Sequence, residues 1–164
     1  MSYNFSEAHI LRVTSITTQA GFEGADALTA GDLAYIGLMR QESGYTIEPE
    51  QEEKSSVSDD LVLTWKLNVN LECLTTLDQA ARDALDGKMV SLLVVSPDFL
   101  SVDESGQITI SGTSPTGTLL APVRLHIKEE EKFGTGKVTP IVLTGGLTKM
   151  SKSQLRKSVT LSQS

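Results

Sequence analysis

The chain has 164 residues, of which 39% are hydrophobic, 21% charged and 5% aromatic, and its net charge is −7. This length fits one domain. The acidic balance argues against a protein that grips nucleic acid across its surface, because such affinity rests on cationic contacts to phosphate. No apolar run approaches the ~18 residues of a membrane span, and residues 1–7 lack the basic and apolar regions of a signal peptide. A single cysteine, Cys73, excludes an intrachain disulfide.

Two strands are predicted near the N-terminus. Residues 9–17 alternate imperfectly between apolar and polar side chains, and residues 32–40 form a second short apolar segment. A helix over 32–40 is disfavoured by Gly37 and by the strand formers Tyr35 and Ile36.

The segment 41–60 is predicted to be a long irregular loop. It contains seven acidic residues against one basic residue, Lys54, and its only apolar residues are Tyr45, Ile47 and Val57. Loops longer than ~12–15 residues are uncommon inside compact domains and tend to be functional or disordered. Four of its acidic residues are candidate assembly contacts: Glu48, Glu50, Glu52 and Glu53.

The strongest periodicity lies in residues 61–73. Apolar residues occupy every second position, which is the period of a half-buried strand. We therefore expect one set to point inward together: Leu63, Trp65, Leu67, Val69 and Leu71. The opposite face should carry Lys66, Asn68 and Asn70.

The period then changes from two to three or four residues. Thr76 and Gln79 form a capping box, and the apolar spacing that follows predicts one short helix over about 76–86. Gly87 is suited to the left-handed conformation that ends helices. Residues 88–96 form a continuous apolar strand, which indicates burial on both faces.

The remaining elements are predicted strands. Residues 99–102 and 107–111 flank a turn signal and indicate a hairpin. Residues 118–128 and 137–144 follow, and Pro140 places the second of these at an edge or a bulge. The expected fold is therefore mainly β, an antiparallel sandwich or barrel with one short helix, an extended loop and extended termini.

The last 21 residues differ from the body in charge. Residues 144–164 carry +4 and no acid, which leaves −11 on a single β-rich domain at residues 1–143. Such a serine-rich end is either a disordered tail or an assembly arm that adds a strand to a neighbour's sheet. Its candidate contacts are Lys149, Lys152, Arg156, Lys157, Val159 and Leu161.

Residues for catalysis or cofactor binding are not grouped in the sequence. His9 and His126 are far apart, and Cys73 ends a core strand, so a metal site is disfavoured. Gly134-Thr-Gly136-Lys137 lacks the spacing of a phosphate loop. The low aromatic content argues against a single-strand nucleic-acid reader. We expect a non-enzymatic protein with no cofactor, no metal and no catalytic residue.

The order of elements resembles that of the tail tube proteins of tailed bacteriophages and related injection machines. The resemblance rests on residues 61–96, where a long amphipathic strand, a short helix and a buried strand follow one another, with a long loop before them. It covers the order of elements in residues 33–143 and includes no sequence motif, so no individual site is carried over.

This resemblance implies a virion structural protein made in the host cytoplasm. It would form a homo-oligomeric ring, six-fold in that family, and the rings would stack through loop 41–60 and meet other tail proteins. DNA would pass through the channel without specific binding, since an acidic lining repels phosphate. The alternatives are a tail terminator, a head–tail connector or a capsid decoration protein, and, from another class, an intracellular β-sandwich ligand-binding module.

Overall fold

The computed structural model describes residues 8–39, 44–52, 62–73, 79–127, 139–143 and 147–164. Strands dominate these residues, which confirms a mainly β fold. The strands are β1 (His9–Val13), β2 (Ala27–Thr29), β3 (Leu33–Leu38), β4 (Gly44–Glu52), β5 (Val62–Cys73), β6 (Met89–Val95), β7 (Leu100–Val102), β8 (Ile108–Ile110), β9 (Thr116–Leu120), β10 (Val123–Ile127), β11 (Thr139–Leu143), β12 (Leu147–Lys149) and β13 (Arg156–Ser162). The helices are α1 (Gln19–Gly24) and α2 (Gln79–Leu85), with 3-10 turns η2 (Ala30–Asp32) and η3 (Lys152–Gln154).

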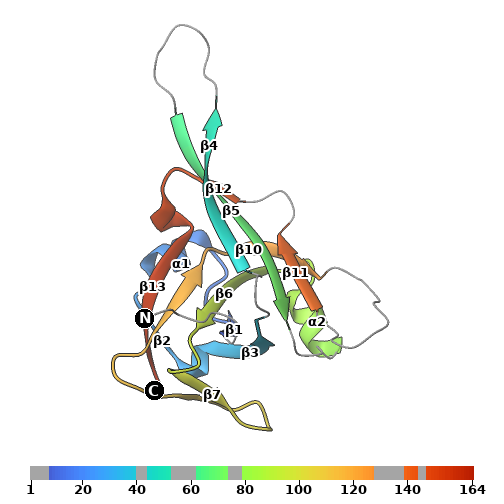
Figure 1. Ribbon diagram of the computed structural model, residues 1–164, viewed down its shortest axis with the longest axis vertical. Coiled ribbons are helices and arrows are strands. Elements are labelled where there is room, and N and C mark those ends of the chain that lie inside the picture. Colours follow the sequence, from blue (N-terminus) through green and yellow to red (C-terminus); the bar gives the residue numbers. More distant parts are fainter. Residues whose placement is uncertain (1–7, 40–43, 53–61, 74–78, 128–138, 144–146) are drawn as a thin grey trace, which may run out of the picture.

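Eleven of the strands belong to one sheet that curls into a half-barrel (Figure 1). Its main path runs β12-β5-β11-β10-β6-β9-β13-β2, with β4 beside β5 and the pair β1 and β3 attached to β6. The pairings are antiparallel except that between β13 and β2, and β7 and β8 form a separate small hairpin. Strands distant in the sequence thus lie side by side, with the C-terminal β13 between β9 and β2.

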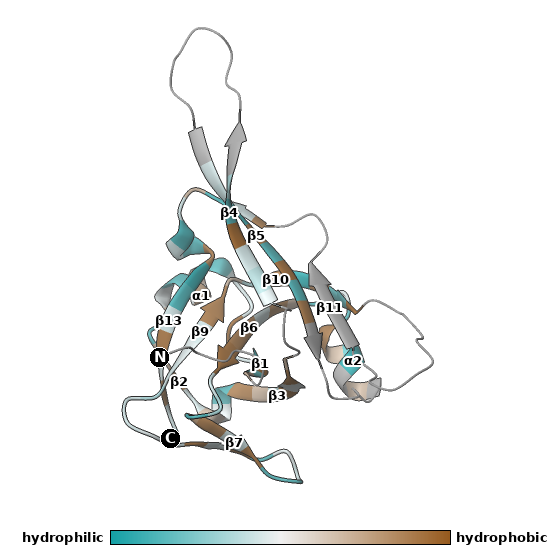
Figure 2. Cartoon of the chain, viewed as in Figure 1, coloured by the Kyte–Doolittle hydropathy of each residue, from teal (hydrophilic) through white to brown (hydrophobic). Residues whose placement is uncertain are grey.

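Strand β6 separates two hydrophobic cores. Its side chains alternate between the two faces of the sheet, so that Val90 and Leu92 join one cluster and Leu93 and Val95 the other. The strand is apolar along much of its length in Figure 2. Burial on both faces explains why this segment is a continuous apolar run, as the sequence predicted.

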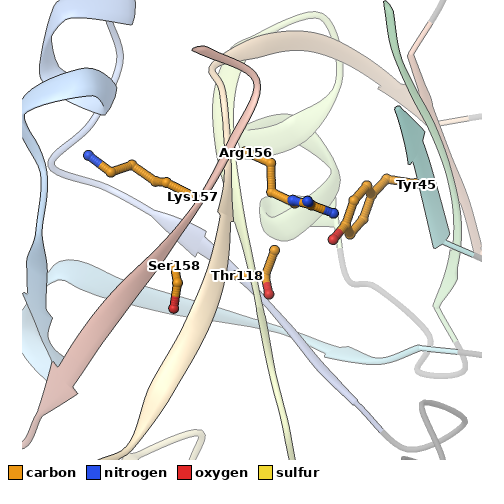
Figure 3. Close-up of a pocket in the computed structure, with 5 residues that line it drawn as sticks. All are labelled: Tyr45, Thr118, Arg156, Lys157 and Ser158. Atoms are coloured by element: carbon orange, nitrogen blue, oxygen red, sulfur yellow. The ribbon is translucent and has the colours of Figure 1, made fainter. Parts of the chain in front are cut away.

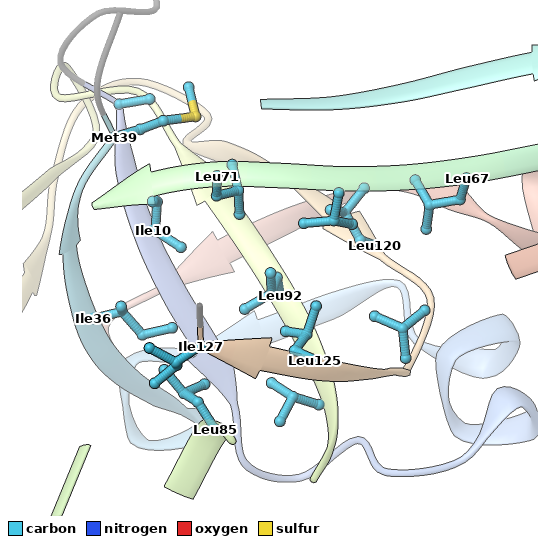
Figure 4. Close-up of a cluster of buried hydrophobic side chains, with 14 of the residues drawn as sticks. Ile10, Ile36, Met39, Leu67, Leu71, Leu85, Leu92, Leu120, Leu125 and Ile127 are labelled. Carbon is cyan, nitrogen blue, oxygen red and sulfur yellow. The ribbon is translucent and has the colours of Figure 1, made fainter. Parts of the chain in front are cut away.

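The first core lies inside the curl of the sheet. Figure 4 shows Leu67 and Leu71 of β5 facing Leu92 of β6 and Leu125 of β10 across it. All four side chains are fully buried. Leu85 of α2 closes the same cluster, so this helix covers one end of the half-barrel.

The second core lies on the other face of β6 and is covered by α1, β2 and the β7–β8 hairpin. Phe22 of α1 is fully buried there, together with Leu11 of β1 and Leu119 of β9. Val159 and Leu161 of β13 belong to the same cluster. Both ends of the chain therefore contribute to this core.

The predicted strand 61–73 is confirmed as β5, including the direction of its central side chains. Leu67, Val69 and Leu71 are buried, whereas Asn70 on the other face is exposed. Trp65 is half-buried against the first core. Thr64 departs from the pattern, because it is buried although it lies on the polar face.

Two of the expected details need correction. The segment 118–128 forms two strands, β9 and β10, because residues 121 and 122, the second of which is proline, interrupt it. Strand β11 lies inside the sheet and not at an edge, between β5 and β10. Pro140 is in register with Glu72 of β5.

The described residues contain two α-helices where one was expected. The C-terminal part of the predicted helix 76–86 is α2, and Gly87 after it takes a positive φ of 71°, as predicted; Thr76 lies outside the described residues. Helix α1 was missed because it has only six residues, too few to show a hydrophobic period. Its start is fixed by Thr18, whose side chain accepts a hydrogen bond from the Gly21 N–H at 3.1 Å.

Candidate functional site

The acidic segment expected to be a loop contains a strand. β4 pairs with β5 from Gly44 opposite Asn70 to Glu52 opposite Val62, and the resulting hairpin projects beyond the rest of the sheet (Figure 1). The expectation of irregular structure over 41–60 was therefore wrong for residues 44–52. Tyr45 and Ile47 lie on one face of β4 and pack against the first core. Burial of every second side chain is the pattern expected of a strand.

The candidate acidic contacts follow this hairpin. Glu48 is exposed and its Oε1 accepts a hydrogen bond from Nδ2 of Asn68 at 2.9 Å. Glu50 and Glu52 lie farther along β4, in register with Thr64 and Val62. Glu53 lies outside the described residues.

The basic C-terminal segment is part of the sheet. β12 pairs with β5, and β13 lies between β9 and β2. Val159 and Leu161, expected as contacts of a tail or arm, are 1% and 5% exposed and belong to the second core. The strand pattern was recognised correctly, but the strand adds to the sheet of its own chain.

Lys157 also has a role inside the chain. Its Nζ donates hydrogen bonds to the carbonyl oxygens of Phe22 and Glu23 at 3.2 and 3.0 Å and lies 3.7 Å from a carboxylate oxygen of Asp26. These carbonyls are at the C-terminal end of α1, where the partial negative charge of the helix attracts cations. Lys157 therefore holds α1 against β13.

The other three candidate cations lie along one face of the β4–β5 hairpin. Lys149 of β12 is in register with Trp65 of β5, and Nζ of Lys152 lies 4.3 Å from the centre of the Trp65 ring. Arg156 begins β13, where it is exposed. We call Lys149, Lys152 and Arg156 the basic strip.

The basic strip ends at a shallow groove of about 350 Å³. Tyr45 of β4, Thr118 of β9 and Arg156, Lys157 and Ser158 of β13 line it. Figure 3 shows the side chain of Arg156 extending toward Tyr45, whereas Lys157 points to the opposite side of the strand. Arg156 and Ser158 share a face because they are two residues apart, and Thr118 is opposite Ser158 in the register.

The polar side chains of this groove have no partner among the described residues. Tyr45, Thr118, Arg156 and Ser158 form no side-chain hydrogen bond or ion pair within the part of the chain that the structure describes. Within that part of the chain, three hydroxyl groups and one guanidinium are therefore available to a ligand. The sequence did not reveal this set, because its members come from three strands that only the fold brings together.

The histidines lie in different environments. His9 of β1 has its Nδ1 2.8 Å from the hydroxyl of Tyr35, and burial lowers the pKa of His9, partly offset by a backbone hydrogen bond with Leu100. His126 lies 3.8 Å from Asp86, near the surface. Within the described residues, no three histidine, cysteine or acidic side chains lie close enough together to hold a metal ion.

None of the helices in the described residues has the length and apolar character needed to cross a membrane.

Comparison with known proteins gives no assignment. The chain matches no protein-family model, no curated protein and no solved structure.

Proposed function

We propose that this chain is a structural protein that assembles with copies of itself, as a subunit of the tail-tube type in a phage or a related injection machine. In this role the half-barrel forms part of a ring wall, and the rings stack around a channel. Other tail proteins cap the assembly, and DNA passes through the channel without specific binding.

The observation that carries this proposal is the projecting β4–β5 hairpin. Its outer part extends beyond the sheet, and β4 pairs only with β5 among the described strands (Figure 1). A two-stranded ribbon is marginally stable alone in water. Contact with a neighbouring subunit would stabilise it, which is the role expected of a segment that links stacked rings.

The sheet edges and the charge also support a ring. Among the described residues, four strands of the main sheet each have one paired neighbour, β2, β3, β4 and β12, so four strand edges remain for contacts. A closed ring covers such edges, which otherwise invite uncontrolled pairing. The net charge of −7 suits a channel through which polyanionic DNA must slide.

A terminator, connector or decoration protein of the same particle is the nearest alternative, since it would use the same fold in a single ring. The groove beside Arg156 favours a different alternative, a ligand-binding module, because small-molecule sites are concave with a few converging polar groups. These alternatives predict different assemblies.

Light scattering coupled to size exclusion, followed by negative-stain imaging, tests the proposal. We expect particles of several subunits that appear as rings or tubes. A variant with residues 51–63 replaced by Asn-Gly is the matched control, because Glu50 and Thr64 are opposite each other and can be joined by a two-residue turn. It should fold and form no stacked tubes. A wild-type chain that stays monomeric at high concentration would overturn the proposal and favour the ligand-binding module.

A further inference from the structure

We propose that the groove formed by Tyr45, Thr118, Arg156 and Ser158 is a receptor for a carboxylate from the acidic strand β4 of a second copy of this chain. The inference rests on the proposed self-association and names the two surfaces that meet. It concerns a direct contact between two chains and requires neither a ring nor a tube.

The chemistry of the groove selects an oxyanion. The guanidinium of Arg156 carries a fixed charge, and its planar fork of N–H donors matches the two oxygens of a carboxylate. The hydroxyl groups of Tyr45, Thr118 and Ser158 add three donors around the same space. None of these groups has a partner among the described residues, so a carboxylate would not displace an existing interaction there.

The strand framework holds these groups in place. Thr118 and Ser158 are opposite each other in the β9–β13 ladder, and Arg156 is in register with the fully buried Leu120. Tyr45 packs against the first core from the other side of the groove. A site built on paired strands requires little rearrangement when a ligand binds, which favours affinity.

The described glutamates of β4 in the same chain do not fit this groove. By strand alternation, Glu48 lies on the face of β4 opposite Tyr45. Glu52 is seven residues beyond Tyr45 on a paired strand, about 23 Å away at ~3.3 Å per residue. The hairpin projects away from the body (Figure 1), so strand β4 is accessible to a second copy.

Charge complementarity identifies the second copy as the occupant. The chain has 21 acidic and 14 basic residues, and residues 48–60 are its most acidic segment. The basic strip continues the positive charge from the groove along the Tyr45 face, since Lys149 is in register with Trp65 and Lys152 lies over the Trp65 ring. An acidic strand can therefore be held at several points, although each exposed pair contributes only ~0–1 kcal/mol.

Charge reversal in the full chain tests this pairing by sedimentation velocity at low and high salt. The receptor variant carries Arg156→Glu and Lys152→Glu, and the strand variant carries Glu48→Lys, Glu50→Lys and Glu52→Lys. We expect each variant alone to self-associate at least ~10-fold more weakly than wild type at low salt, with the deficit shrinking at 1 M salt, where charges are screened within ~3 Å.

Mixing the variants gives the decisive result. The native receptor of one variant can bind the native acidic strand of the other, so the mixture should form 1:1 dimers. A chain that carries all five changes should self-associate again, because both charges are reversed. A mixture that stays monomeric, or a fivefold variant that does not recover, overturns the inference.

Matched controls separate the groove from general charge effects. Lys88→Glu makes the same change at an exposed position outside the basic strip and should associate like wild type. Tyr45→Phe with Ser158→Ala removes two hydroxyls without a change in charge and should weaken association at every salt concentration. Circular dichroism confirms that each variant is folded.

The inference and the proposed function can fail separately. Rings or tubes that form normally from the receptor variant would overturn the carboxylate receptor and leave the tail-tube proposal standing. Charge-dependent dimers that form no rings or tubes would overturn the tail-tube proposal and leave the carboxylate receptor standing. A wild-type chain that never self-associates would overturn both.

Discussion

The acidic β4–β5 hairpin and the basic C-terminal segment have similar sequences in one respect: both are polar segments with a few alternating apolar residues. In the structure their roles differ. β13 lies between two strands, and Val159 and Leu161 are buried in a core. Among the strands that the structure describes, β4 pairs with β5 alone, and its apolar residues Tyr45 and Ile47 are half-buried.

Charge and apolar content therefore do not determine how much a terminal or connecting segment contributes to the stability of the fold. The number of paired neighbours and the depth of the apolar face decide it. A strand in the middle of a sheet contributes backbone hydrogen bonds on both edges and buries side chains, whereas an outer strand contributes on one edge. We therefore expect β13 to be necessary for folding and the outer hairpin to be dispensable.

Deletion of each segment should show the largest difference. Removal of residues 156–164 takes away β13, with the buried side chains of Val159 and Leu161 and the partly buried Lys157. We therefore expect this chain to show no cooperative thermal unfolding transition. The chain with residues 51–63 replaced by Asn-Gly should retain one, because long surface loops can be shortened at little cost. Equal effects of the two deletions would contradict the comparison. Differential scanning calorimetry provides the measurement.

Single side-chain truncations make the comparison quantitative. Leu161→Ala should lower the free energy of unfolding by about 2–5 kcal/mol, as expected for a buried leucine. Ile47→Ala on β4 should cost clearly less, because Ile47 is only partly buried. Urea denaturation followed by tryptophan fluorescence measures both. A larger loss for Ile47→Ala would show that the hairpin base is the more important element.

The close packing around Gly117, next to β13, provides a third test. Gly117 of β9 is opposite Val159, and a Cβ there would lie 2.8 Å from Cδ1 of the buried Leu93. Gly117→Ala should therefore cost about 1–3 kcal/mol of stability through overpacking. Gly24→Ala is the control, since an added Cβ meets nothing within 4 Å there. Similar unfolding midpoints for the two variants would mean that Leu93 can move aside.

Two lysines of the C-terminal segment should also differ, Lys157 within β13 and Lys152 beside the β4–β5 hairpin. Lys157 is largely buried and its Nζ bonds two carbonyl oxygens of α1, so Lys157→Met should cost about 1–3 kcal/mol. Lys152 is exposed over Trp65, and Lys152→Met should cost only ~0.5–1 kcal/mol. Denaturation at fixed pH and salt measures the difference. A greater loss for Lys152→Met would contradict the assignment of Lys157 as the link to α1.

The smallest expected effect is a dependence of stability on pH through His9. Burial lowers the pKa of His9 from 6.5, so the folded state binds the proton less readily than the unfolded state. Stability is then complete above about pH 6.5 and falls as the pH decreases through that value, until the folded-state pKa is reached. His9→Gln should remove this slope while keeping a hydrogen-bonding group near Tyr35. An unchanged slope would assign it to other groups.

The sequence alone determined the mainly β class, β5 and its inward residues, the two-sided burial of β6, and the position of α2. These are local properties: the period of apolar residues and the signals at helix ends depend only on neighbours in the chain. Even β13 was recognisable as a strand from the alternation of Val159 and Leu161.

Only the tertiary structure decided which strands pair. It placed the C-terminal segment between β9 and β2, made residues 44–52 a hairpin strand, and joined Tyr45, Thr118, Arg156 and Ser158 in one groove. These residues are separated by up to 113 positions in the sequence. Periodicity shows which face of a strand is buried but not which strand covers it, because backbone hydrogen bonds between strands are the same for any partner.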